Sequence, residues 1–170
     1  MAGQLLYIKS NKKLYKKDNE YYTPKRIVNY FGNFDYDPAT TIEKAKDLEI
    51  PNYDTIETDG LSSDWTKYKR IWCNPPFTIK FDFLKKAVDT YKSNKNIDIY
   101  ILLTSESLAT KKFKNTMQGV KMKLFIPGGR INFESGIGKK GKSPAFGSVI
   151  IKLHDKYDIE LIDMDKLLKE

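Results

Sequence analysis

Cysteine and histidine are almost absent from the chain, with one residue of each among 170. A single cysteine excludes an intrachain disulfide, and one Cys with one His supplies too few soft ligands for zinc, so we expect no metal. Long apolar runs are also missing, and residues 1–20 combine several lysines with only a short apolar piece. That pattern is unlike a secretory signal or a membrane span, so we expect a cytoplasmic protein with no membrane partner.

The residues that are present suffice for one globular domain. Hydrophobic residues make up 40% of the sequence and aromatic residues 13%, which is typical of a folded protein rather than a disordered one. A length of 170 residues matches a single domain with a real core. We expect that domain to span residues 21–170 as a monomer, preceded by a lysine-rich arm or edge strand at 1–20.

Basic residues are concentrated between positions 111 and 142. This segment holds nine lysine or arginine residues and one acid, Glu134, so its net charge of +8 equals that of the whole chain. A clustered basic surface favours a polyanion, most readily nucleic acid. Lysines that simply decorate solvent-exposed faces are the alternative, and they remain an open interpretation.

Helical and strand patterns alternate along the chain. Thr23 as N-cap and Pro24 as first residue predict a helix that Gly32 ends. Further helices are predicted at 41–48, 79–92, 107–120 and 164–169, and strands at 34–37, 53–57, 70–73, 98–103, 121–126, 146–153 and 157–162. This order predicts a doubly wound α/β sheet that a C-terminal antiparallel hairpin, formed by the last two strands, closes.

The most informative stretch is Ile71-Trp72-Cys73-Asn74-Pro75-Pro76-Phe77. Its apolar, strand-forming run ends at two prolines, which cannot continue a sheet ladder, so the chain must leave the sheet at Asn74. The sequence therefore predicts a rigid turn at the carboxyl edge of a strand. Ligands bind at that edge in open α/β sheets.

This turn offers groups suited to methyl transfer onto the exocyclic amine of a nucleobase. Such an amine is a poor nucleophile because its lone pair is delocalised into the ring. The Asn74 side-chain oxygen and the Pro75 carbonyl can each accept one of its N–H groups, and Phe77 can stack on the ring. Fixed acceptors around a nitrogen that becomes positive provide electrostatic preorganisation. A strand that merely turns a corner at its prolines is the alternative.

Related chemistries use the same groups, so other substrates remain open: cytosine N4, guanine N2 of ribosomal RNA, or a protein glutamine. Methylation at cytosine C5 is different because it needs a cysteine nucleophile. Cys73 lies in a predicted buried strand, and we expect it to be a packed core thiol.

Six segments together resemble the phage-type (Dam-like) DNA N6-adenine methyltransferases. They are Tyr22-Thr23-Pro24, residues 34–39, Asp59-Gly60-Leu61 followed by Trp65, residues 72–77, residues 129–133, and residues 143–148. The resemblance implies a class I (Rossmann-like) methyltransferase fold, S-adenosylmethionine as cofactor, and adenine N6 in DNA as the target, in a bacterial or phage-infected cell. No insertion is long enough for a separate target-recognition domain.

The resemblance also implies roles for individual residues. Those that would contact or border the cofactor are Tyr22, Thr23, Pro24, Asp37, Pro38, Ala39, Asp59 and Asn74; Pro75, Pro76 and Phe77 complete the catalytic turn with Asn74. Thr23 and Pro24 would lie near the methionine end, and Asp59 would accept from the adenine amino group. The wider class carries a glycine in the loop after Asp37-Pro38, and this chain does not. A relative that binds DNA without the cofactor therefore remains a further hypothesis.

A methyltransferase that acts on a base inside a duplex must flip the base out, which requires phosphate contacts around it. The residues suited to such contacts are Arg130, Lys139, Lys140 and Lys142. Arg130 follows a Gly-Gly turn, and the three lysines belong to the glycine-rich stretch 134–143, which we expect to be a mobile surface loop.

Overall fold

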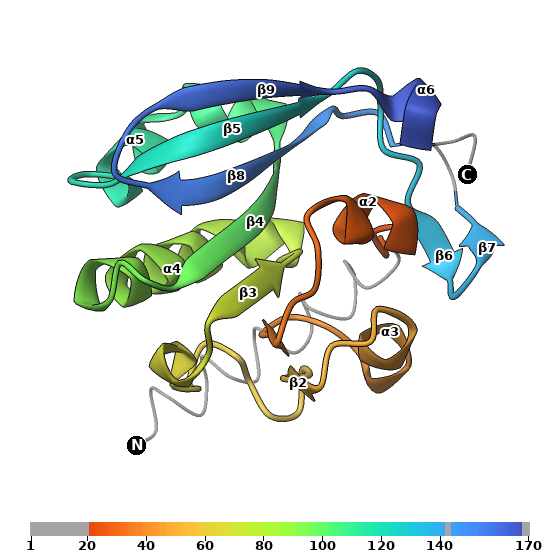
Figure 1. Ribbon diagram of the computed structural model, residues 1–170, viewed down its shortest axis with the longest axis horizontal. Coiled ribbons are helices and arrows are strands. Elements are labelled where there is room, and N and C mark those ends of the chain that lie inside the picture. The colour runs from red at the N-terminus through yellow and green to blue at the C-terminus, as the bar shows by residue number, and fades with distance from the viewer. Residues whose placement is uncertain (1–20, 142–143, 168–170) are drawn as a thin grey trace.

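The computed structural model describes residues 21–141 and 144–167, and the expected arm at 1–20 lies outside them. Within this part of the chain a seven-stranded sheet has the order β2-β1-β3-β4-β8-β5-β9 (Figure 1). Its strands are β1 (Tyr36–Asp37), β2 (Asn52–Tyr53), β3 (Arg70–Cys73), β4 (Asp98–Thr104), β5 (Lys121–Pro127), β8 (Ser148–His154) and β9 (Asp158–Ile162). A separate hairpin pairs β6 (Glu134–Gly136) with β7 (Lys139–Lys140).

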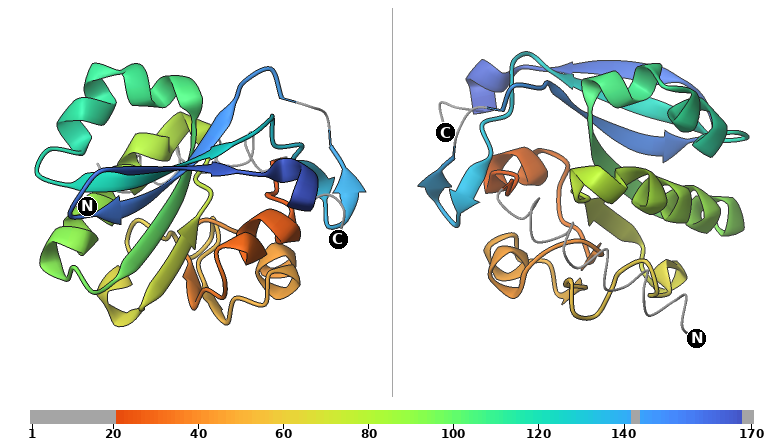
Figure 2. Two further views of the ribbon diagram at one scale, coloured as in Figure 1. Left: turned by 45° about the horizontal axis from the view of Figure 1, so that its top comes forward. Right: turned by 180° about the vertical axis from the view of Figure 1, so that it is seen from behind.

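Helices cover both faces of the sheet. The α-helices are α2 (Lys25–Tyr30), α3 (Ile42–Asp47), α4 (Lys80–Ser93), α5 (Lys111–Thr116) and α6 (Met164–Leu167). Three short 3₁₀ helices are η1 (Trp65–Lys67), η2 (Phe77–Ile79) and η3 (Ser105–Ala109). Figure 2 shows α4 and α5 on one face and α2 on the other. No helix among the described residues is long and apolar enough to cross a membrane.

Two hydrophobic cores follow from this layering, one on each face of the sheet. One core lies between the helices α4 and α5 and the central strands. It contains Phe83 of α4, Phe113 of α5 and Ile101 of β4. The other packs α2 through Ile27 against residues such as Trp72. Alternate residues of β4 enter the two cores, as expected for a strand buried on both faces.

The strand order creates a reversal beside β1. The chain passes from β1 to β2 on one side and then returns to β3 on the other, and all three strands are parallel. Such a reversal is the topological switch point at which doubly wound sheets bind ligands, outside the carboxyl ends of the strands. The predicted doubly wound α/β architecture is confirmed.

The predicted pairing of the last two strands is wrong. Strand β8 is antiparallel to both β4 and β5, whereas β9 pairs only with β5, in parallel. Strand β5 therefore lies between them, and there is no C-terminal hairpin of β8 with β9. The two runs are adjacent in sequence, which favoured a hairpin, but each pairs with β5 over five positions instead.

Two further local predictions need correction. The helix predicted over 107–120 is divided into η3 and α5 because the Thr110 side chain accepts from the Phe113 N–H and starts a new helix there. The stretch predicted as a mobile loop forms the β6–β7 hairpin over residues 134–140. Gly138 turns it with φ +67°, and Gly141 closes it by donating to the Phe133 carbonyl at 3.1 Å.

Candidate active site

A pocket lies at the switch point, between the carboxyl ends of β1 and β3. The β1 side contributes Asp37, Ala39 and Thr40, and the β3 side contributes the turn from Asn74 to Phe77. Residues 21–23 form a further wall. The predicted site residues brought together here are Tyr22, Thr23, Asp37, Ala39, Asn74, Pro75, Pro76 and Phe77.

Asn74 is held by a backbone group more than fifty residues away in sequence. Its Nδ2 donates to the Tyr21 carbonyl at 2.8 Å. A carbonyl can only accept, so this bond fixes which end of the amide faces Tyr21 and turns Oδ1 away from it. The preceding strand residues Ile71, Trp72 and Cys73 are buried, which makes the turn rigid. The site therefore presents an amide oxygen as an acceptor in a fixed direction.

Phe77 belongs to a group of aromatic rings beside this amide. Its ring centroid lies 5.3 Å from that of Tyr21 and 4.8 Å from that of Phe146. Phe133, which is 1% exposed, meets Tyr21 edge-on at 5.8 Å. Phe77 itself is only half-buried, so it carries an accessible aromatic surface at the edge of the pocket.

Asp37 brings a carboxyl group into the pocket wall, where only 2% of the residue is exposed. Burial raises its pKa to about 7, because a charged carboxylate loses its hydration there. Bonds from Ala39 and Thr40 and the charge of Lys44 oppose that rise only in part. The Ala39 N–H donates to Oδ1 at 3.0 Å. A donor from a bound ligand would restore the lost stabilisation of the charged form.

Thr23 does not cap α2 as predicted. The N-cap is Pro24, which has no side chain able to accept, and Thr23 instead lines the pocket. Its Oγ1 is buried and finds no hydrogen-bond partner among the described residues. A buried hydroxyl without a partner is costly in a folded protein. Its place in the wall therefore indicates a ligand group that would bond to it.

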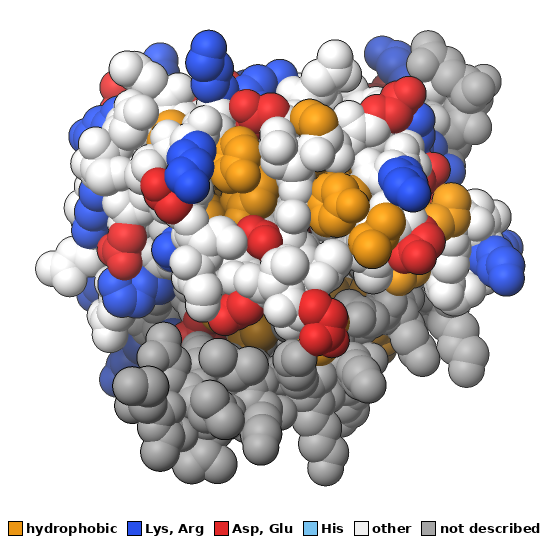
Figure 3. Space-filling model, turned by 90° about the horizontal axis from the view of Figure 1, so that it is seen from below, with side chains coloured by type: hydrophobic (Ala, Val, Ile, Leu, Met, Phe, Trp, Pro, Cys, Tyr) orange, Lys and Arg blue, Asp and Glu red, His pale blue; other side chains and the backbone are white. Residues whose placement is uncertain are grey.

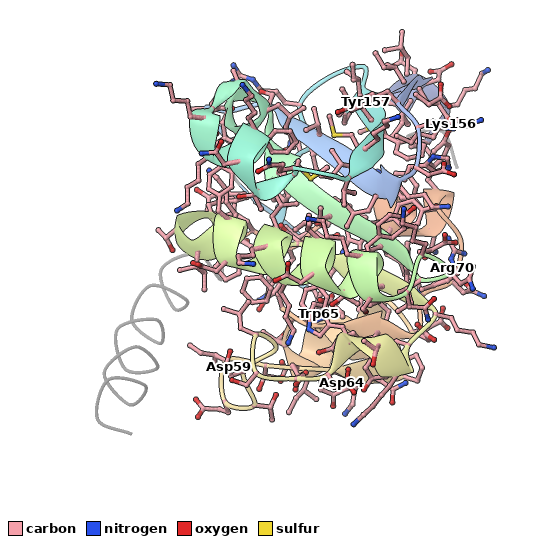
Figure 4. All side chains as sticks on the ribbon, turned by 90° about the vertical axis from the view of Figure 1, so that its left-hand side faces the viewer. Asp59, Asp64, Trp65, Arg70, Lys156 and Tyr157 are labelled. Carbon is pink, nitrogen blue, oxygen red and sulfur yellow. The ribbon has the colours of Figure 1, made fainter. Side chains whose placement is uncertain are left out.

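The close backbone approach beside the loop after Asp37 is made by Gly60 rather than by a glycine in that loop. A Cβ on Gly60 would lie 1.9 Å from the Pro38 carbonyl oxygen. The Gly60 carbonyl accepts from the buried Trp65 Nε1 at 2.7 Å. Trp65 packs in turn on Phe83 of α4, and Figure 4 shows it between that helix and the turn that carries Asp59. The Asp-Gly-Leu…Trp pattern therefore holds the second loop, which contains Gly60, against the first, which contains Pro38.

Asp59 lies in that second loop and does not line the pocket. It has φ +57°, its Oδ1 accepts from the Leu61 N–H at 3.2 Å, and its Oδ2 accepts from Ser62 Oγ at 2.7 Å. These bonds account for an aspartate in a tight turn. The contact with the cofactor adenine predicted for it stays a prediction.

Pro24, Pro38 and the basic residues also lie outside the pocket wall. Arg130 is exposed and its Nη1 donates to the Pro144 carbonyl at 3.1 Å. Lys139 and Lys140 are exposed on β7, and Lys142 lies outside the described residues. Cys73 is fully buried, as predicted, and burial raises the pKa of its thiol, so it is a core residue.

Several residues of the site gave no signal in the sequence. They are Tyr21, Thr40, Lys44 and Leu48, which line the pocket together with Trp72. Lys44 is the least expected, because it is 3% exposed on a short helix of mixed charge. Trp72 falls inside the recognised stretch, but nothing in the sequence showed which face of β3 it occupies.

Comparison with known proteins assigns the chain to a family. A model of the family "DNA N-6-adenine-methyltransferase (Dam)" matches residues 9–164. The DNA N-6-adenine-methyltransferase of Escherichia phage T1 is 32% identical over 83 residues, which cover 46% of this chain and 34% of that protein. The match thus spans about a third of the phage T1 enzyme.

Two solved structures show weaker likeness. One is the type IIL restriction-modification enzyme MmeI in complex with DNA, with 16% identity, a TM-score of 0.43, and coverage of 72% of this chain and 22% of that one. The other is a predicted O-methyltransferase from Agrobacterium tumefaciens, with 12% identity, a TM-score of 0.35, and coverage of 74% and 64%.

The family match and the doubly wound sheet together define the class of protein, a methyltransferase with a Rossmann-like fold. The chain belongs to the DNA N-6-adenine-methyltransferase (Dam) family.

Proposed function

We propose that this protein transfers a methyl group from S-adenosylmethionine to the N6 amine of adenine in DNA. One observation carries the proposal: a single pocket at the switch point joins the buried carboxyl of Asp37 to the oriented amide of Asn74. The first group suits the polar end of a cofactor, and the second suits the amine that accepts the methyl group. Family membership supports the same reaction.

The pocket wall fits the proposed cofactor, which supplies an electrophilic methyl group when bound. Asp37 would accept from its ammonium group or ribose hydroxyls, and Thr23 Oγ1 is a buried hydroxyl in need of a partner. Leu48 and Trp72 provide apolar surface in the same wall. These features favour a cofactor-binding enzyme over a relative that binds DNA alone.

The catalytic turn would hold the target amine by acceptors alone. Asn74 Oδ1 and the Pro75 carbonyl oxygen would each accept one N–H of N6, which leaves the nitrogen lone pair free to form the new C–N bond. As that bond forms, the bond between the methyl group and the cofactor sulfur would break, N6 would become positive, and one N6 proton would then pass to solvent. The two oxygens stabilise the positive charge because they are fixed before the reaction. Phe77 would stack on the purine with its accessible ring.

Cofactor affinity is expected to depend on pH through Asp37. With a pKa of about 7, its carboxyl is mostly protonated below pH 7 in the free protein, whereas pairing with a donor requires the ionised form. Calorimetry should therefore show S-adenosylmethionine affinity falling by on the order of 10-fold per pH unit below pH 7. Asp37→Asn should bind more weakly and without this dependence. Equal wild-type affinity at pH 5.5 and 7.5 would remove Asp37 from the site.

The raised pKa of Asp37 also affects the stability of the free protein, which should decrease with rising pH, whereas cofactor affinity should increase. Between the ordinary pKa of an aspartate, about 4, and about 7, the folded free protein binds more protons at Asp37 than the unfolded chain does. The contribution of Asp37 to the free energy of unfolding therefore decreases as the pH rises through that window. A bound cofactor should reverse this trend at the upper end, because it stabilises the carboxylate.

We assign the DNA-facing side to the β6–β7 hairpin and the adjoining basic residues. Lys139 and Lys140 are exposed on β7, and the hairpin is joined to the pocket through an antiparallel bridge between Glu134 and Tyr22. The face at the β2 and α3 end is mixed, with acidic, basic and apolar side chains scattered over it (Figure 3). Phosphate contacts are better served by the hairpin side.

Replacing Lys139, Lys140 and Lys142 by alanine is expected to weaken DNA binding at low salt and to leave cofactor affinity unchanged. Each lost phosphate contact should flatten the slope of log K against log [salt] by about 0.9, because fewer counterions are released. A matched control replaces the exposed lysines Lys67, Lys69 and Lys95, which lie near the amino ends of β3 and β4. If the salt series of the wild type and of the hairpin variant superimpose, the hairpin does not contact the phosphate backbone of the DNA.

Transfer of a labelled methyl group separates the proposed substrate from the other planar amines. Purified protein with labelled cofactor should label DNA, and digestion of that DNA should place the label in N6-methyladenine. Label in N4-methylcytosine, in RNA or in protein would replace adenine N6 as the target.

A further inference from the structure

Glu134 connects three parts of the molecule that the proposed reaction would use. Its backbone forms a pair of hydrogen bonds with Tyr22, one of 3.1 Å from the Tyr22 N–H and one of 2.8 Å to the Tyr22 carbonyl. Its carboxylate accepts from Lys44 Nζ at 3.2 Å. The residue therefore ties the β6–β7 hairpin, the segment beside Tyr22, and helix α3 to one point.

The Lys44–Glu134 pair is shielded from water. The Lys44 side chain is 4% exposed and that of Glu134 is 19% exposed, whereas exposed pairs such as Lys85–Asp89 leave more than half of each side chain in solvent. Lys44 Nζ also donates to Asp47 at 2.7 Å. Removing one partner of a buried pair leaves the other charge buried and uncompensated, which is strongly destabilising. This contact therefore links the two elements more firmly than a surface ion pair would.

Tyr21, the residue before Tyr22, contacts the turn that carries Asn74 and Phe77. The Tyr21 carbonyl accepts from Asn74 Nδ2 at 2.8 Å, and the Tyr21 ring packs on Phe77 with centroids 5.3 Å apart. The terminal torsion of an asparagine side chain has broad, roughly two-fold preferences. The position of the Tyr21 carbonyl is therefore what selects the orientation of the Asn74 amide.

We propose that Glu134 is a positioning residue for Asn74. Its bridge to Tyr22 and its ion pair with Lys44 hold Tyr21 in register, and Tyr21 in turn directs Asn74 Oδ1 toward the target amine. The hairpin that carries Lys139 and Lys140 is thereby linked to the catalytic amide through Glu134. The catalytic consequence rests on the proposed function, whereas the orientation of Asn74 does not.

The direct test observes the Asn74 side-chain amide without cofactor or DNA. Protein labelled with ¹⁵N-asparagine gives side-chain NH₂ signals, and the Asn74 signal is the one lost in Asn74→Asp. Because one of its protons bonds to the Tyr21 carbonyl, it should exchange slowly with solvent in the wild type. Glu134→Ala should shift this signal and speed its exchange, and Glu134→Gln, which keeps an acceptor for Lys44, should restore part of the protection.

Two controls isolate the effect. Asp47→Ala removes the other partner of Lys44 but leaves the ion pair between Lys44 and Glu134 in place, so it should leave the Asn74 signal unchanged. Asn52 Nδ2 donates to the Asp35 carbonyl at 2.9 Å and provides an internal reference away from the pocket. If Glu134→Ala fails to fold, Glu134→Gln decides the result by itself. The proposal is overturned if the Asn74 signal does not move in Glu134→Gln and also does not move in Glu134→Ala when that variant folds.

Kinetics then separate positioning from DNA binding. Glu134→Ala should lower kcat by on the order of 10- to 10²-fold, as expected for a misplaced reacting group, with the KM for DNA little changed. Loss of Lys139 and Lys140 should instead raise that KM. A wild-type protein that does not methylate adenine would refute the proposed function while leaving the NMR result valid, so the two failures are distinguishable.

Discussion

Replacing Asn74 by alanine is expected to reduce methyl transfer by at least 10²- to 10³-fold, the usual loss when one preorganised group is removed from the transition state. The variant keeps the Pro75 carbonyl but loses the second acceptor for the target amine. It also loses the bond from Nδ2 to the Tyr21 carbonyl at 2.8 Å, which should cost about 1 kcal/mol of stability. Steady-state methylation and thermal unfolding of the same preparation measure both effects.

Asn52→Ala is the matched control for this substitution. Asn52 also donates from Nδ2 to a backbone carbonyl, that of Asp35 at 2.9 Å, but it does not line the pocket. It should lose a similar amount of stability and retain activity. If Asn74→Ala kept near-normal turnover, Asn74 would not be the acceptor for the amine, and the pocket would need another catalytic group.

Gly60→Ala should damage the protein more than its small size suggests. The new Cβ would lie 1.9 Å from the Pro38 carbonyl oxygen and 2.8 Å from the Pro38 carbonyl carbon, both of which are backbone atoms that cannot rotate away. The two loops must separate, which disturbs the wall near Asp37 and the bond from Trp65 to Gly60. We expect the free energy of unfolding to fall by about 1–3 kcal/mol or more, with weaker cofactor binding in any protein that folds.

Gly129→Ala provides the comparison, because nothing lies within 4 Å of a Cβ at that position. Denaturant unfolding of the two variants measures the difference directly. Equal stability of Gly60→Ala and Gly129→Ala would mean that the loops are not in close contact, and the role assigned to the Asp-Gly-Leu turn would be wrong.

Local chemistry made much of the turn from Asn74 to Phe77 predictable. The bounds of β3, Arg70–Cys73, are those that the sequence indicated, because two prolines leave the chain no way to continue the sheet. Helix α4 was clear for a similar reason, since its apolar residues repeat at helical spacing. Helix α3 lies within the predicted range 41–48, and Thr41 caps it, with Thr41 Oγ1 accepting from the Lys44 N–H.

The remaining features depend on contacts between distant parts of the chain. Thr23 followed by proline is typical of a helix start, but tertiary packing turns its hydroxyl toward the pocket instead. The position of β5 between β8 and β9 is a choice among strand partners, which local patterns do not encode. The anchoring of Asn74 by Tyr21 involves a backbone carbonyl, and a carbonyl carries no residue signature.

The loop after Asp37 also depends on a distant part of the chain. The wider class places a glycine directly after the residues that correspond to Asp37-Pro38, and this chain has Ala39 there. The structure meets the steric need from the opposite side, where Gly60 lets the second loop touch Pro38. The lack of a glycine after Pro38 and the presence of Gly60 are both visible in the sequence. Only the packing shows that Gly60 meets the steric need at Pro38.

Nucleoside analysis of DNA from cells expressing the protein tests the central claim most directly. The host should lack adenine methylation of its own, and the DNA should be digested and analysed by mass spectrometry. We predict N6-methyladenine in DNA from cells with the wild-type protein and none above background with Asn74→Ala at equal expression. Wild-type DNA without N6-methyladenine, or with a different methylated base, would contradict the account.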